Sequence, residues 1–94
     1  MSIESEELRR RTVELRRLAE VIERTPLMTL DRDVGPDTWR SPAADDCRAQ
    51  LSRDQLDLHR AAEDLRWSAY RLEREADELD VLEVLEAAAR MVGA

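Results

Sequence analysis

Six apolar residues recur at intervals of seven through the second half of the chain, over a stretch that contains no proline or glycine between residues 43 and 92. The repeat consists of Ala44, Leu51, Leu58, Leu65, Leu72 and Leu79. Apolar residues spaced by seven lie along one side of an α-helix and form a coiled-coil-like seam. Ser41 is a favourable N-cap and Pro42 a favourable first residue. The pattern therefore predicts one long helix over about residues 42–92.

Small residues accompany this repeat and favour the close approach of a second helix. They are Cys47, Ala61, Ala62, Ala69 and Ala76. An amphipathic stretch over about residues 4–25 supplies that second helix. Its apolar residues, which fall largely on one side, are Leu8, Leu15, Leu18, Val21 and Ile22. We expect an all-α helical hairpin, a single domain over residues 1–94 with a turn region at 26–41, in which these two apolar stripes pack together.

The ends of the first helix are also marked in the sequence. Ser5 is predicted to cap its start, and Pro26 is predicted to end it because proline has no backbone N–H and restricts the residue before it. Thr25 and Pro26 would equally suit the start of a short extra piece over about residues 27–31.

The two helices are unequal in length. About 22 residues make a helix of roughly 33 Å, whereas residues 42–92 make one of roughly 75 Å. We therefore expect the first helix to cover only about the first half of the second, leaving the part beyond Leu65 without a neighbour in the same chain. The second helix also carries another apolar stripe, roughly 120° from the leucines. It consists of Leu56, His59, Trp67, Tyr70, Val81, Val84, Leu85, Ala88 and Val92.

Two aromatic residues followed by a valine- and leucine-rich end are typical of a helix that packs against a partner. The alternative is that Trp67 and Tyr70 fold under the 26–41 segment. We favour a partner surface, occupied by a second copy of the chain or by another helical protein. Two hairpins paired in this way would form a dimeric four-helix bundle.

Charge and composition argue against several other classes of protein. The net charge of −7 argues against nucleic acid as the main partner, and the basic cluster from Arg9 to Arg17 is interspersed with glutamates, as on a solvated face. No apolar run approaches the roughly 20 residues of a membrane span, and the N-terminus lacks the apolar core of a cleavable signal peptide. We therefore expect synthesis in the cytosol and, if the protein is exported, a route that does not use such a signal.

Catalytic and metal sites are not expected. The chain has one cysteine and one histidine, and Cys47 and His59 would lie about three turns apart on one helix. Cys47 is predicted to be a small buried residue of the seam. Because there is no nucleophile–base pair, glycine-rich phosphate loop or metal-ligand cluster, we expect a non-enzymatic protein that needs no cofactor, metal ion or small-molecule substrate.

The turn sequence DTWRSPAADDCRAQL resembles the Trp-x-Gly turn of the early-secreted-antigen family, the small helical hairpins of type VII secretion systems. Trp39 matches the family's tryptophan, Arg40 its variable position, and Ser41 stands where the family has glycine. Arg74 stands four residues after Tyr70, where the family's export signal has an acidic residue. The resemblance covers roughly Leu8 to Leu79.

This resemblance implies a hairpin that forms homo- or heterodimers, with Trp39 packed at the end of the hairpin. It also implies that the chain binds a secreted protein as a partner, targeting factor or chaperone. The alternative function is a cytosolic coiled-coil adaptor or oligomerisation module unrelated to secretion.

Overall fold

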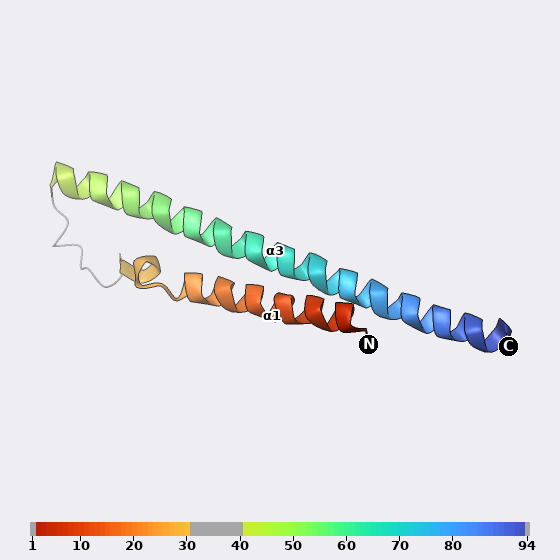
Figure 1. Ribbon diagram of the computed structural model, residues 1–94. Helices are drawn as coiled ribbons and strands as arrows, with labels where there is room; N and C mark the ends of the chain where they lie inside the picture. The colour runs from red at the N-terminus through yellow and green to blue at the C-terminus, as the bar shows by residue number, and fades with distance from the viewer. Residues whose placement is uncertain (1, 31–40, 94) are drawn as a thin grey trace.

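The protein is a helical hairpin with two unequal arms. The computed structural model describes residues 2–30 and 41–93, all of which are helical or in the short connections between helices. Helix α1 spans Ile3–Glu23, the 3₁₀ helix η1 spans Pro26–Thr29, and α3 spans Pro42–Gly93 (Figure 1). The molecule measures 80 × 15 × 14 Å. The predicted all-α hairpin with a long second helix is confirmed, and α3 is continuous throughout its 52 residues.

Serine residues cap the starts of both helices. Ser2 and Ser5 form a capping box at the start of α1: the Ser5 N–H donates to Ser2 Oγ over 3.0 Å, and the Ser2 N–H donates to Ser5 Oγ over 3.1 Å. The N-cap is thus Ser2, so the prediction that Ser5 caps this helix was wrong by three residues. At the start of α3 the Ala44 N–H donates to Ser41 Oγ over 3.0 Å, as a serine N-cap requires.

The short piece expected after Pro26 exists as the single 3₁₀ turn η1. Thr25 has extended backbone angles and Pro26 occupies the first helical position. The side-chain amide of Gln55 on α3 donates to the Leu27 carbonyl over 2.9 Å. This bond attaches η1 to α3 beyond the end of α1.

Small side chains, rather than leucines, form the inner seam between α1 and α3. Ser5, Thr12 and Ala19 of α1 and Ala62, Ala69 and Ala76 of α3 are 0–2% exposed. The Thr12 hydroxyl lies 3.0 Å from the Leu8 carbonyl and 3.3 Å from the Ala69 carbonyl, so the two backbones approach closely. The expected leucine-on-leucine packing is therefore only partly right. Leucines flank the seam and are half-buried, namely Leu8, Leu15, Leu58, Leu65, Leu72 and Leu79.

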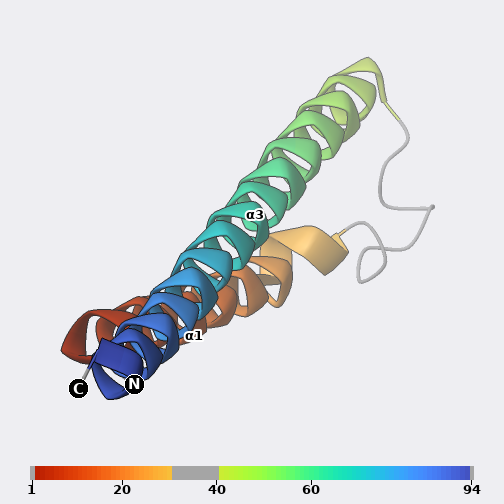
Figure 2. The same ribbon diagram turned by 90° about the vertical axis from the view of Figure 1, so that its right-hand side faces the viewer.

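The position of α1 along α3 differs from the sequence prediction. Glu23, the last residue of α1, pairs with Arg66, and Arg9 pairs with Asp80. Helix α1 therefore lies along the middle and later part of α3, and both ends of α3 project beyond it (Figures 1 and 2). The expectation that α1 covers the first half was wrong, because the connection from Arg24 to Ser41 is long enough for α3 to begin well beyond α1.

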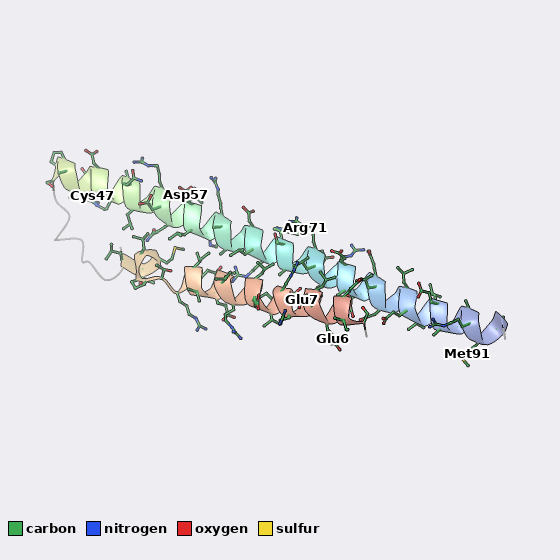
Figure 3. The ribbon with its side chains drawn as sticks, viewed as in Figure 1. Glu6, Glu7, Cys47, Asp57, Arg71 and Met91 are labelled. Atoms are coloured by element: carbon green, nitrogen blue, oxygen red, sulfur yellow. The ribbon has the colours of Figure 1, made fainter. Side chains whose placement is uncertain are left out.

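Four residues predicted for the inner side are exposed, namely Leu18, Val21, Cys47 and Ala61. Leu18 and Val21 are 52% and 60% exposed on α1, because they lie on the sides of the helix away from the Thr12 seam. Cys47 is also exposed, so the prediction that it is buried was wrong. It lies near the start of α3, in the part that α1 does not reach (Figure 3).

Ion pairs run beside the seam at intervals of seven residues. Arg9 donates to Asp80 over 2.6 Å and to Asp77 over 2.9 Å, Arg16 pairs with Glu73, and Arg66 pairs with Glu23. Within α1, Arg10 and Arg11 both pair with Glu7. The basic cluster is therefore divided between pairs inside α1 and pairs that join α1 to α3.

Candidate protein-interaction surface

A side of α3 that α1 leaves largely uncovered carries the strongest candidate for a functional surface. At about 100° per residue, Trp67 and Tyr70 lie roughly 120° around α3 from the Ala62–Ala76 seam. We call this side the outer face. From the start of α3 towards its end it comprises Leu56, Arg60, Glu63, Trp67, Tyr70, Arg74, Asp77, Val81, Val84 and Ala88.

Trp67 and Tyr70 form the centre of the outer face. Their ring centroids are 5.9 Å apart and the ring planes meet at 89°, an edge-to-face contact that aromatic pairs favour. Trp67 is 58% exposed and Tyr70 is 48% exposed. The pair presents two large apolar rings to solvent, in contact with each other.

Two hollows lie next to each other along the outer face. The first, of about 360 Å³, is lined by Glu63, Arg66, Trp67 and Tyr70. The second, of about 580 Å³, continues towards the end of α3 and is lined by Arg74, Asp77, Glu78, Val81 and Leu82. Both combine apolar side chains with charges of both signs. Such a surface suits an amphipathic helix that carries complementary charges.

All nine residues predicted to bind a partner are exposed in the structure. Leu56 is 47% exposed and Val92 is 88% exposed. The structure does not bring the nine into one compact patch, because they extend along almost the whole length of α3. Leu85 and Val92 lie to one side of the line through Trp67 and Val81.

The prediction missed two exposed apolar residues near the end of α3. Leu82 is 54% exposed and Met91 is 82% exposed, and Met91 lies close to the C-terminal end, beyond the reach of α1 (Figure 3). The sequence held a signal for them, since residues 81–92 include only three charged residues and are apolar on every side. A helix that is apolar all round is expected to be covered.

The predicted turn motif is only partly visible. Trp39 and Arg40 lie outside the described residues, so the predicted position of the tryptophan is untested. Ser41 lies at the start of α3, where its hydroxyl accepts the Ala44 N–H. Ser41 therefore serves as a helix cap.

The inner ion pairs perturb the carboxylates that face α1 or α3. The hydrogen bond from Arg66 lowers the pKa of Glu23, and the hydrogen bond from Arg9 lowers the pKa of Asp80. These groups hold the two helices together and remain charged at neutral pH. Glu23 and Asp80 are thus already paired with arginines within the hairpin, whereas Glu63 and Arg74 are exposed on the outer face.

Within residues 2–30 and 41–93, no three His, Cys, Asp or Glu side chains are grouped so that they could hold a metal ion. In the same part of the chain, no helix is both long enough and apolar enough to cross a membrane. Comparison of the chain with protein-family models, with curated proteins and with solved structures found no match.

Proposed function

We propose that this protein is a non-enzymatic interaction module whose outer face binds another helical protein. The observation that carries the proposal is the exposed pair of Trp67 and Tyr70, continued by a line of exposed valines and leucines to the end of α3. Tryptophan and tyrosine are enriched where binding energy is concentrated in protein interfaces.

The spacing of the exposed side chains favours a helical partner. Trp67 and Tyr70 are three residues apart, and Val81, Val84 and Ala88 continue at intervals of three and four. This is the spacing with which one helix contacts another along its length. Exposed apolar side chains of this size, bordered by charged ones, are typical of a docking surface.

The class of partner rests on the resemblance of the Trp39–Ser41 turn to the type VII secretion hairpins. We propose that the partner is a secreted helical protein of such a system and that this hairpin acts as its partner, targeting factor or chaperone. Complex formation would take place in the cytosol, before export. The absence of basic clusters from the outer face supports a protein partner rather than nucleic acid.

The test is co-expression with helical proteins encoded next to this gene, followed by co-purification. We expect a stable complex that is lost when Trp67→Asp and Leu85→Asp are combined. The matched control combines Cys47→Asp and Ala61→Asp, which add the same charge at exposed positions on the side of α3 away from Trp67.

Loss of the complex in the double variant Trp67→Asp with Leu85→Asp, but not in the control, would support the proposed surface. Equal binding by both variants would contradict it. A partner with no connection to type VII secretion, lost in the same selective way, would favour the alternative function of a cytosolic adaptor.

A further inference from the structure

We infer that the outer face binds a second copy of the chain, with the two α3 helices antiparallel and the two-fold axis between Ser68 and Ala69. The inference rests on the proposed function, because it names the occupant of the same face in the isolated protein, which the secreted partner would replace. In this register each residue of the outer face lies opposite the residue at the same distance beyond the axis in the other copy.

The aromatic pair lies at the centre of this arrangement. Trp67 faces Tyr70 of the second copy, and Tyr70 faces Trp67 of the second copy. Four rings then meet around the axis, and each ring already lies edge-to-face with its neighbour in its own chain. If roughly 100 Å² of each ring is covered, the rings contribute about a quarter of the roughly 1,600 Å² of a typical stable interface.

Charges in the same register are complementary on both sides of the rings. Glu63 faces Arg74 of the second copy, and Arg60 faces Asp77 of the second copy. Asp77 is 62% exposed despite its bond to Arg9, so it remains accessible to a second arginine. Two-fold symmetry repeats each pairing, which gives four pairs of opposite charge on the outer face.

Further from the axis one apolar pair continues this match, although Val84 falls opposite Arg53 of the second copy. Leu56 faces Val81 of the second copy, and both are about half exposed in one chain. Beside the outer face, Asp64 comes next to Arg71 of the second copy. The apolar end of α3 from Val81 to Gly93 lies along the start of the other α3. Each end of α3 that α1 leaves uncovered thus lies beside the uncovered opposite end of the other copy.

Neighbouring antiparallel registers fit less well. An axis at Leu72 places Trp67 against Asp77. An axis between Glu75 and Ala76 covers the aromatic rings with valines and sets Arg74 against Asp77. It leaves the other charges without partners, because it places Glu63 against Ala88 and Arg60 against Met91. Charged groups that lose water without gaining a partner are costly. Electrostatic complementarity therefore selects the axis between Ser68 and Ala69.

A charge exchange tests the pairing between copies. In one chain Glu63 and Arg74 are eleven residues apart on a single helix, too far to touch. We expect Glu63→Arg to raise the dimer dissociation constant about tenfold or more, because it places arginine against Arg74 of the second copy. The double variant Glu63→Arg with Arg74→Glu restores the opposite charges, so it should regain most of the affinity. Circular dichroism of each variant verifies that the hairpin remains folded.

Cysteine cross-linking distinguishes the registers, in a chain that also carries Cys47→Ser. The pair Leu56→Cys with Val81→Cys is expected to give covalent dimers on mild oxidation, since these positions meet between copies and cannot meet within one helix. The pair Tyr70→Cys with Val81→Cys would cross-link only with the axis between Glu75 and Ala76. Predominant cross-linking of the second pair would overturn the inferred register.

A wild-type chain that stays monomeric by sedimentation at high micromolar concentration would overturn the dimer as a whole. Such a monomer could still bind a different helical protein in a manner that requires Trp67, and the proposed function would then stand without the dimer. Failure of both the self-association and the Trp67-dependent binding would contradict the proposed function as well.

Discussion

Arg66 of α3 binds Glu23, the last residue of α1, through both of its terminal nitrogens; the bond from Nη2 to Oε2 is 2.8 Å long. The charges here are reversed relative to the pairs Arg9–Asp80 and Arg16–Glu73, in which α1 supplies the arginine. Sliding α1 by seven residues one way would bring Glu23 to Glu73. Sliding it the other way would bring Arg16 to Arg66. The reversal therefore favours one alignment of the two helices.

Reversing one charge of that pair should weaken the hairpin. We expect Glu23→Arg to lower the melting temperature by a few degrees, because it places arginine against Arg66 in a partly exposed setting. Adding Arg66→Glu should recover most of the loss. The control Glu14→Arg makes the same change at an exposed position of α1, and it should have a much smaller effect. A Glu23→Arg chain as stable as the control would show that this pair does not select the alignment.

Acid should destabilise the hairpin through the same contacts. The arginine hydrogen bonds lower the pKa of Glu23 from 4.5 and the pKa of Asp80 from 3.8. A carboxylate whose pKa is lowered by folding stabilises the fold above its ordinary pKa, and this contribution is lost as the pH falls through the lower, folded-state value. We therefore expect a falling melting temperature below about pH 4.5, steepest as these two groups become protonated.

The variant that combines Glu23→Gln with Asp80→Asn identifies the groups responsible. It should be less stable than wild type at neutral pH and should lose less stability on acidification. An acid-induced loss as large as that of the wild type would assign the effect to other carboxylates.

Close packing at the seam predicts a strong dependence on side-chain size. Ala69 is fully buried, and its carbonyl accepts a bond from the Thr12 hydroxyl. Ala69→Leu should destabilise the hairpin by about 1–3 kcal/mol, because the larger side chain forces the helices apart. Ala61→Leu makes the same change at an exposed position of the same helix. Urea unfolding of the two variants should separate them clearly, and similar stabilities would mean that the seam is not tightly packed.

Periodicity was sufficient to predict the helices but not the way they pack. Repeats of seven and the absence of proline placed the boundaries of α1 and α3 within two residues of the observed ones. Small residues such as Ala69 were expected beside the leucines and are buried, but the leucines flank the seam instead of filling it, because close approach of two backbones selects small side chains. The offset of α1 along α3 depends on the connection between them, whose path local sequence patterns do not determine.

Exposure of the outer face was predictable because it follows from the angle between residues on one helix. Trp67 and Tyr70 lie too far around α3 from the seam for α1 to cover them, whatever its offset. Cys47 was assigned to the buried side by the same angular reasoning. Cys47 is exposed because burial also requires that α1 lie beside that part of α3, which it does not reach.

The central claim is that the outer face and the uncovered end of α3 require a partner, and amide hydrogen exchange tests it most directly. A helix end without packing is expected to fray, whereas residues 62–80 are held by α1. In a dilute sample, at about 1 µM, amides of residues 84–92 should exchange at close to the rates of an unfolded chain. They should gain protection at high concentration or with a bound partner. Protection of residues 84–92 as strong as that of residues 62–80, in a sample shown to be monomeric, would contradict the account.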